Sequence, residues 1–379
     1  MKLFIDAAPI CTDKISGIGH TVLHLVKELD KSAPKDITII LLVPLLKHGV
    51  INRYGFSERV SLKTVPLPAR VVNKLNRMRL LPKMDLLFGR GSYLFGNFTN
   101  WPLTKGSKSF TYVHDVAYAR HPEFIHPLNL RMLREFLPSW VQRTNTVITV
   151  SEFSKREIED VFGLEEDKVR VVFNGIDHDE FSPRSPDEVS SVKKTYEIDG
   201  DYFIFLSNLE PRKNIQKMIE AFMLLPTEIQ RSHSLVMVGA DGWNNEDILH
   251  SIERAKEAGI RIIRPDRYVP DEHLPALLSG ATGLIHVALY EGFGLSPLQA
   301  MACGTPVIVS NTTSLPEVVG NGGLQVDPLD VPAIAGAISK IATDHQLASK
   351  LSQQGKQQAA LFTWAHSVDK LVAILRRTT

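Results

Sequence analysis

The 379-residue sequence has few cysteines and no long apolar run. Its two cysteines, Cys11 and Cys303, lie far apart and lack metal-ligand spacing, which excludes a disulfide scaffold and favours a reducing compartment. No window approaches the roughly 18 consecutive apolar residues that a membrane-spanning helix requires. The apolar run at the beginning of the chain is also too short for a signal peptide. We therefore expect a cytoplasmic protein.

The composition is that of an ordinary globular protein, with 44% hydrophobic and 22% charged residues. The length exceeds that at which one hydrophobic core usually stops growing, so two domains are expected. The net charge of +1 conceals an asymmetry, because residues 1–150 contain 21 Lys and Arg against 10 Asp and Glu. Such a basic region indicates an anionic partner, such as phosphate groups or an acidic membrane surface. We expect no nucleic-acid partner.

Short β-branched runs alternate with helical stretches, which predicts an α/β protein with two Rossmann-like, doubly wound domains. The expected strands are 2–6, 37–43, 61–65, 109–114 and 146–150, then 202–207, 234–238, 260–263, 283–287, 306–309 and 324–326. The expected helices are 19–29 and one that begins after Ser151, then 214–224, 246–258, 271–279, 296–302 and the tail from 330 onward. Residues 181–201 are interpreted as a connector. The predicted domains are 1–185 and 186–361, with a terminal helix at about 362–379 packing back on the first.

Ligands of open α/β sheets bind outside the carboxyl ends of the strands, so the residues that follow each strand are the candidates. In the first half, Ser16-Gly17-Ile18-Gly19-His20 precedes a helix whose first N–H groups could face a phosphate. This motif is an incomplete Gly-x-Gly-x-x-Gly, and a plain tight turn is the alternative. His114-Asp115 ends another expected strand, where an active-site role competes with a structural hydrogen bond.

Two further motifs follow strands of the second half. Ser207, Asn208, Arg212 and Lys213 lie in a loop between a strand and a helix, where two cations could hold a diphosphate, although a solvated basic loop is the alternative. Residues 291–300, Glu-Gly-Phe-Gly-Leu-Ser-Pro-Leu-Gln-Ala, combine a carboxylate with glycines that expose backbone N–H groups. Their Ser-Pro pair predicts a helix that begins in N-cap and N1 order.

With these motifs, the chain resembles the GT-B fold retaining glycosyltransferases of family 4 over nearly its whole length. The resemblance implies that the two doubly wound domains face a central cleft. The motifs that carry the resemblance are 16–19, 114–115, 150–154, 174–177, 212–214, 291–299 and 315–317. The resemblance implies an enzyme that transfers a hexose, with mannose or rhamnose favoured, from a nucleotide-diphosphate sugar to a glycan or lipid-linked acceptor in cell-surface polysaccharide synthesis. It favours GDP-mannose as the donor, with UDP- and dTDP-sugars left open.

The resemblance also implies a role for each matching residue. Glu291 would contact the sugar hydroxyls, and Arg212 with Lys213 would bind the diphosphate. His114 would lie beside the reacting carbon. The residues expected to line the rest of the donor site are Gly17, Gly19, Asp115, Ser207, Asn208, Tyr268, Val269, Phe293, Gly294, Leu295 and Gln299. Because cations and a helix N-terminus would stabilise the leaving diphosphate, we expect no metal and no other cofactor.

One departure from the family pattern stands at position 299, where glutamine replaces the glutamate that usually binds the ribose hydroxyls. An amide oxygen still accepts a hydrogen bond but loses the charge that strengthens it. This substitution keeps a non-catalytic partner subunit among the alternatives, beside a GT-B sugar-nucleotide epimerase or isomerase. An NAD-dependent dehydrogenase is disfavoured by the incomplete glycine motif.

Much of the basic excess lies within residues 70–90, which we call the basic segment. Its six basic residues are interleaved with apolar ones at helical spacing. The pattern is suited to an anionic membrane surface or a lipid-diphosphate acceptor, and hence to peripheral attachment at the inner face of the cytoplasmic membrane. The alternative is a solvated basic helix that packs on its own domain.

Overall fold

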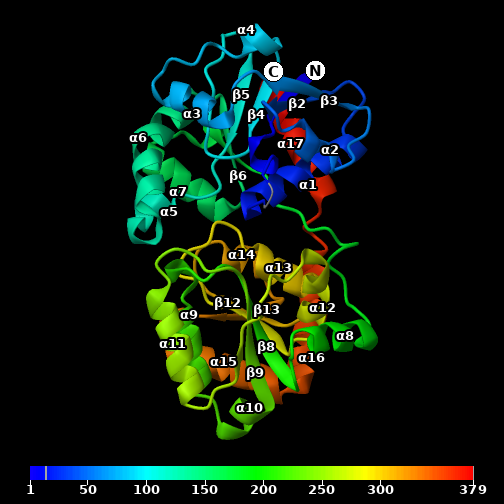
Figure 1. Ribbon diagram of the computed structural model, residues 1–379, viewed down its shortest axis with the longest axis vertical. Coiled ribbons are helices and arrows are strands. Elements are labelled where there is room, and N and C mark those ends of the chain that lie inside the picture. Colours follow the sequence, from blue (N-terminus) through cyan, green and yellow to red (C-terminus); the bar gives the residue numbers. More distant parts are fainter. Residues whose placement is uncertain (13–14, 379) are drawn as a thin grey trace. The chain divides into compact units, whose positions relative to one another are not determined.

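The computed structural model describes residues 1–12 and 15–378. The chain divides into two compact units: unit 1 comprises Met1–Gly175 and Trp364–Thr379, and unit 2 comprises Ile176–Thr363. Each unit contains one parallel sheet with helices against it (Figure 1). The α/β class expected from the sequence is therefore confirmed.

The division falls at Gly175, earlier than the expected boundary at Ser185. The reason is local pairing. Ile176 forms a parallel bridge with Thr363, and its N–H donates to the carbonyl of Phe362 at 3.1 Å. The segment that follows Gly175 is thereby tied to the second unit before the charged connector begins.

The sheet of unit 1 has the strand order β3-β2-β1-β4-β5-β6-β7, and all neighbouring strands are parallel. Its strands are β1 (Lys2–Asp6), β2 (Thr38–Pro44), β3 (Val60–Val65), β4 (Ser92–Phe95), β5 (Lys108–Tyr112), β6 (Thr146–Thr149) and β7 (Val169–Val171). Consecutive residues Leu3, Phe4 and Ile5 are all buried, which requires cover on both faces of the sheet. Strands β4 and β7 were not predicted, because runs of three or four residues carry too little periodicity to be recognised.

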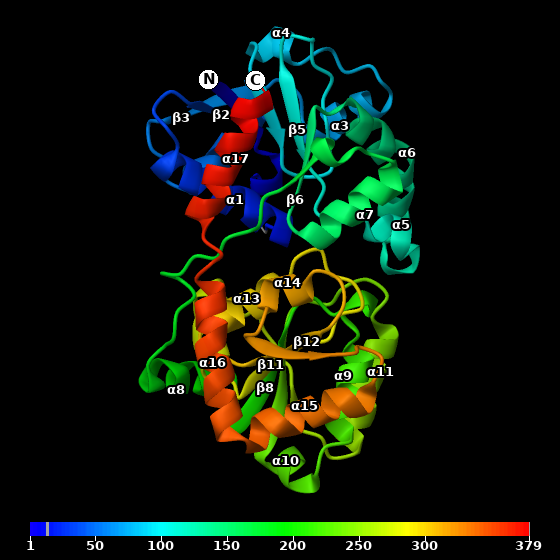
Figure 2. The same ribbon diagram turned by 180° about the vertical axis from the view of Figure 1, so that it is seen from behind.

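The helices of unit 1 are α1 (Gly17–Ser32), α2 (His48–Asn52), α3 (Ala69–Arg77), α4 (Asp85–Phe88), α5 (Ala117–Arg120), α6 (Pro127–Arg143), α7 (Glu152–Phe162) and α17 (Trp364–Thr378). The terminal helix α17 lies beside α1 in both views of the ribbon (Figures 1 and 2). The rings of His24 and Trp364 stack with centroids 5.5 Å apart, and Ser367 donates to the carbonyl of Phe173 at 2.7 Å. Stacking and hydrogen bonding thus fix the end of the chain on unit 1.

The sheet of unit 2 has the order β10-β9-β8-β11-β12-β13 and is also parallel throughout. Its strands are β8 (Asp201–Leu206), β9 (His233–Val238), β10 (Ile262–Ile263), β11 (Gly283–His286), β12 (Val307–Ser310) and β13 (Gly323–Val326). Its helices are α8 (Pro186–Thr195), α9 (Ile215–Met223), α10 (Thr227–Ser232), α11 (Glu246–Glu257), α12 (Leu274–Ser279), α13 (Leu295–Ala302), α14 (Leu315–Val319), α15 (Val331–Thr343) and α16 (His345–Ala359). Figure 2 shows α9, α11 and α15 on one side of these strands and α16 on the other.

Helix α8 lies inside the segment that the sequence analysis interpreted as a connector. Its N-terminus is a capping box, in which Ser185 Oγ accepts from the N–H of Glu188 and the Glu188 carboxylate accepts from the N–H of Ser185. Pro186 occupies the first helical position. The Ser-Pro-x-Glu pattern was present in the sequence and could have predicted this helix.

Each sheet contains one point where the strand order reverses, and these points position the candidate sites. In unit 1 the reversal lies between β1 and β4, and in unit 2 it lies between β8 and β11. Loops that leave neighbouring strands there run in opposite directions and open a crevice at the carboxyl ends. We call these places the unit 1 switch point and the unit 2 switch point.

Candidate active site

The unit 2 switch point brings together the loops that follow β8 and β11, which carry Arg212, Lys213 and Glu291. A short 3-10 turn over Pro211–Lys213 ends at Asn214, whose φ of 58° is left-handed. Asn214 precedes α9, but its side chain does not cap that helix, because the amide nitrogen donates to the carbonyls of Val287 (3.0 Å) and Pro328 (2.7 Å). The side chain therefore ties the cationic loop to the loop after β11.

The two cations converge on one oxygen of Glu291. Arg212 Nη1 lies 3.0 Å and Lys213 Nζ lies 2.8 Å from Glu291 Oε2. Arg212 Nε also donates to Glu210 Oε1 at 2.7 Å. The Lys213 side chain is only 4% exposed. The predicted grouping of Arg212, Lys213 and Glu291 is thus present in the structure, as a partly buried ion cluster with a second carboxylate beside it.

Electrostatics keeps Glu291 ionised. Burial alone would raise its pKa, but the charges of Lys213 and Arg212 outweigh that effect and lower the pKa to about 2. Glu291 Oε1 receives no hydrogen bond from the described residues. The carboxylate therefore keeps one acceptor oxygen available for a ligand hydroxyl.

His286, the last residue of β11, belongs to this cluster and was not predicted. Its Nε2 lies 4.0 Å from Glu291 Oε2, beyond hydrogen-bond distance, and neither ring nitrogen has a partner among the described residues. Burial lowers the pKa of His286 to about 3, and the Lys213 charge adds to this effect, so the imidazole is neutral. No sequence pattern marks His286, because a histidine inside a buried strand is indistinguishable from a core residue.

The glycine loop after Glu291 is shaped by close packing. Gly294 has a φ of 113°, and a Cβ there would lie 2.8 Å from Leu315 Cδ2. Ser314 Oγ, which was also not predicted, lies 2.8 Å from the carbonyl oxygen of Glu291 and 2.9 Å from that of Phe293. The buried ring of Phe293 meets Phe362 edge to face at 5.8 Å. Only glycine fits at position 294, and the hydroxyl of Ser314 holds the loop.

Helix α13 begins at Leu295, with Gly294 at the N-cap, so the predicted start at Ser296-Pro297 is wrong. The glycine supplies the backbone angles that a capping serine would not adopt. As a result the N–H groups of Leu295 and Ser296 donate to nothing among the described residues. The side-chain amide of Gln299, one turn further along the helix, also forms no hydrogen bond within the described part of the chain.

The remaining unit 2 candidates surround this cluster less closely. Ser207 and Asn208 follow β8 directly, and the N–H of Ser207 donates to the carbonyl of Val238 at 3.0 Å. Tyr268 is 68% exposed, whereas Val269 is buried. The contact of Tyr268 and Val269 with a nucleobase stays a prediction.

In unit 1, the turn at Ser16 caps α1. Ser16 Oγ accepts from the N–H of Gly19 at 3.3 Å, so this amide is already used by the fold. A Cβ at Gly19 would lie 2.8 Å from the carbonyl oxygen of Pro9, whereas one at Gly17 would meet nothing within 4 Å. Gly19 is therefore required for packing, and the more exposed Gly17 is the better placed of the two to approach a phosphate.

His114 and Asp115 follow β5 but form no hydrogen bond with each other among the described residues. His114 Nε2 lies 2.9 Å from the carbonyl oxygen of Gly96, and Asp115 Oδ1 accepts from the N–H of Ala117 at 3.0 Å. Burial lowers the pKa of His114, so its imidazole is neutral at physiological pH. These contacts fix both side chains at the carboxyl end of the sheet, and their role toward a donor sugar stays a prediction.

The basic segment is not one continuous helix. Helix α3 ends at Arg77, Arg79 adopts a left-handed φ of 59°, and α4 begins only at Asp85. All six basic residues are exposed, as are Met78, Leu80, Leu86 and Leu87. The segment therefore presents apolar and cationic side chains to solvent together. Among the described residues, no helix is long and apolar enough to cross a bilayer.

Two Asp-x-Asp triplets, 177–179 and 199–201, occur in the sequence, a spacing often used to hold a divalent metal. Asp177 Oδ1 accepts from the N–H groups of Asp179 and Glu180, which makes the first triplet a turn. The second lies at the amino end of β8, opposite the switch point. In the part of the chain that the structure describes, no three His, Cys, Asp or Glu side chains are grouped to hold a metal ion.

Comparison with known proteins agrees with this geometry. Residues 189–358 match the family model of glycosyl transferases group 1, and residues 15–180 match that of glycosyltransferase family 4. The O-antigen chain mannosyltransferase B of Escherichia coli is 35% identical over 98% of both chains. The chain belongs to the family 4, group 1 glycosyltransferases. It is thus a sugar-transferring enzyme.

A further relative and two solved structures are also similar to this chain. The serotype-specific mannosyltransferase WbdA of Escherichia coli is 30% identical over 60% of this glycosyltransferase, which spans only 28% of that longer protein. The crystal structure of Anabaena HepE in complex with UDP and glucose aligns over 99% of both chains with a TM-score of 0.74 at 17% identity. Sucrose-phosphate synthase from Thermosynechococcus elongatus aligns with the same TM-score at 18% identity. These neighbours have the GT-B fold, as the sequence predicted.

Proposed function

We propose that this enzyme transfers mannose, with retention of configuration, from GDP-mannose to a glycan acceptor of the O-antigen type. The observation that carries the proposal is the ion cluster of Arg212, Lys213 and Glu291 at the unit 2 switch point, beside the uncapped N-terminus of α13. The names of the related mannosyltransferases support the sugar and the polysaccharide class. Under this proposal, unit 2 binds the donor and unit 1 binds the acceptor.

The cluster provides complementary groups for both parts of a nucleotide sugar. Arg212 and Lys213 supply positive charge for the diphosphate, and the free N–H groups of Leu295 and Ser296 add backbone donors. Glu291 Oε2 holds the two cations in place, while Oε1 is left to accept from a sugar hydroxyl. The same carboxylate thereby aligns the phosphate-binding cations and orients the sugar.

A front-face displacement fits these groups. The bond between the anomeric carbon and the diphosphate oxygen breaks, and the acceptor hydroxyl oxygen bonds to the same face of that carbon. The acceptor proton passes to the departing diphosphate oxygen. Arg212 and Lys213 stabilise the negative charge that builds on the diphosphate in the transition state. Glu291 is held by two cations, which leaves it a weak nucleophile for a covalent intermediate.

A panel of nucleotide sugars tests the proposal. The enzyme is incubated with GDP-, UDP- and dTDP-sugars and a mannooligosaccharide, and release of nucleoside diphosphate is followed together with the anomeric configuration of the product. We expect GDP release from GDP-mannose and an α-linked product. An inverted product would refute retention, and binding without turnover of any donor would indicate the partner-subunit alternative.

We propose further that the reaction needs no divalent metal, because the two cations and the helix N-terminus already neutralise the leaving group. Activity should be unchanged after dialysis against EDTA, measured as the rate of GDP release from GDP-mannose. Activity that disappears with EDTA and returns with Mn²⁺ would contradict this.

The basic segment is proposed to hold the enzyme at an anionic membrane surface, where lipid-linked acceptors are found. Exposed cationic side chains attract anionic headgroups, and exposed Leu80, Leu86 and Leu87 can enter the interface. Sedimentation with vesicles that contain anionic lipid should be strong at low salt and weaken as salt increases. Equal binding to neutral vesicles, or none to anionic ones, would leave the solvated-helix interpretation.

A further inference from the structure

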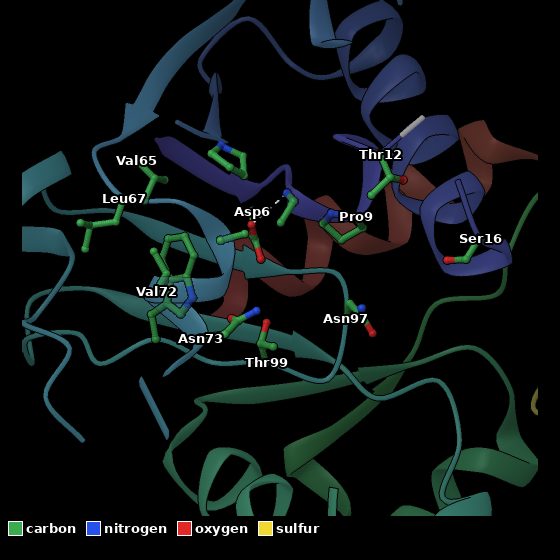
Figure 3. Close-up of a pocket in the computed structure, with 14 residues that line it drawn as sticks. Asp6, Pro9, Thr12, Ser16, Val65, Leu67, Val72, Asn73, Asn97 and Thr99 are labelled. Atoms are coloured by element: carbon green, nitrogen blue, oxygen red, sulfur yellow. Dashed lines mark hydrogen bonds between the residues drawn. The ribbon is translucent and has the colours of Figure 1, made fainter. Parts of the chain in front are cut away.

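A pocket of about 380 Å³ opens at the unit 1 switch point and lies wholly within unit 1. It is lined by residues that follow β1, β2, β3 and β4 and by one face of α3 (Figure 3). Its volume is within the range of sites that bind small molecules. The residues that carry the following argument are Asp6, Val72, Asn73, Thr99 and Trp101.

Two oxygen atoms of the pocket, one on Thr99 and one on Asp6, have no hydrogen-bond partner among the described residues. Thr99 Oγ1 is buried and has no hydrogen bond with any described residue. Asp6 Oδ1 accepts from the N–H of Ala8 at 3.0 Å, and its second oxygen receives nothing from the described residues. Figure 3 shows Asp6, Asn73 and Thr99 pointing toward the same part of the cavity. Buried polar groups are normally satisfied, so the unpartnered oxygens of Thr99 and Asp6 indicate a ligand with hydroxyl groups, which the exposed side chain of Asn73 can also reach.

The charge of the pocket restricts the ligand further. None of the described residues that line it is Lys or Arg, and Asp6 is the one carboxylate among them. A carboxylate accepts from a sugar hydroxyl but repels a phosphate. The basic side chains of α3, by contrast, are exposed, while Val72 on the same helix is buried and lines the cavity. The pocket and the basic segment therefore suit different parts of a substrate.

Apolar surface completes the site. Trp101 is 4% exposed and packs edge to face on Phe95 with centroids 5.5 Å apart, so its ring is held rigidly at the pocket wall. A pyranose has one face of C–H groups and a rim of hydroxyls. Such a ring can contact an aromatic and aliphatic wall while its hydroxyls reach polar groups on the other side.

We propose that this pocket binds one uncharged pyranosyl residue of the acceptor glycan, through hydrogen bonds to Thr99, Asn73 and Asp6. The inference rests on the proposed function and specifies where, and to which chemical class, unit 1 binds. The donor is excluded as the occupant, because its diphosphate requires the cations that lie at the unit 2 switch point.

Ligand-observed NMR with methyl α-D-mannopyranoside and an α-linked mannobiose, without nucleotide, tests the inference on the full-length enzyme. Thr99→Val and Asn73→Ala should each weaken mannoside binding at least about 5-fold, as expected for a lost hydrogen bond. Thr38→Val and Asn52→Ala change exposed residues of unit 1 outside the pocket and should leave binding unchanged. GDP binding by calorimetry should be equal in all four variants, which also shows that they fold.

Two outcomes would overturn the inference. The first is mannoside affinity that is absent in the wild type or the same in Thr99→Val and Asn73→Ala as in the controls. The second is displacement of the mannoside by millimolar inorganic phosphate or pyrophosphate, which would show an anion site. Failure of the proposed function has a different signature, since the wild type would then bind no nucleotide sugar whatever its mannoside affinity.

Discussion

The two switch points have the same topology and opposite electrostatics. At the unit 2 switch point, Glu291 is held by Arg212 and Lys213, and its pKa falls to about 2. At the unit 1 switch point, Asp6 forms no ion pair with any described residue, and burial raises its pKa to about 6. Topology therefore determines where a ligand can bind, while the side chains on the loops determine which chemistry is bound.

The difference suggests a division of labour within the enzyme. A carboxylate that is neutralised by two cations leaves a site able to receive a diphosphate, because further hydrogen-bond donors lie at the start of α13. A carboxylate without a cation suits hydroxyl groups. The predictions below test this contrast by altering one switch point at a time.

The largest effect is expected from the cations. Lys213→Ala and Arg212→Ala should each lower kcat by roughly 10²–10³, because they remove charge that stabilises the departing diphosphate. Initial rates of GDP release measure this. Lys217→Ala is the matched control, since Lys217 lies on α9 in an exposed pair with Glu220. Near-normal rates in both Lys213→Ala and Arg212→Ala would contradict the proposal that these side chains bind the diphosphate.

Glu291→Gln should destabilise the protein by about 3 kcal/mol at pH 7, because it leaves Lys213 buried without its counter-charge. The folded pKa of Glu291 lies below its unfolded value of 4.5, so its stabilisation is present above pH 4.5 and is lost as the pH falls toward 2. The difference in the free energy of unfolding between variant and wild type, measured by urea unfolding, should therefore become smaller below pH 4.5. A gap independent of pH would contradict the ion cluster.

Asp6→Asn should have the opposite effect on stability, because it should increase the free energy of unfolding. Burial raises the pKa of Asp6 from 3.8 in the unfolded chain to about 6 in the folded protein, so its ionisation costs no stability below pH 3.8 and lowers stability progressively as the pH rises through 6. The asparagine has no charge to bury and keeps an acceptor for the N–H of Ala8. At pH 8 the free energy of unfolding of Asp6→Asn should be about 3 kcal/mol higher than that of the wild type, with little difference below pH 4. A destabilised variant at pH 8 would show that Asp6 has a cationic partner.

The grouping of Arg212, Lys213 and Glu291 could be predicted from the sequence because its signals are local, whereas the roles of these residues toward a donor stay predictions. Glu291, Arg212 and Lys213 follow strands directly, and strand ends meet at one edge of a parallel sheet. His286 and Ser314 were missed because their contacts arise from tertiary packing. The pocket at Thr99 and Trp101 was missed because it follows β4, whose four residues carry no distinctive pattern. Gln299, at the position where the family pattern has glutamate, lies one turn into α13.

Hydrogen–deuterium exchange with and without GDP tests the contrast between the switch points most directly. GDP should protect the loops over residues 207–214 and 291–299 of unit 2 and leave residues 65–101 of unit 1 unchanged. Protection of residues 65–101 without protection of the unit 2 loops would contradict the account, because the nucleotide would then occupy the pocket with the Asp6 carboxylate rather than the site with the two cations.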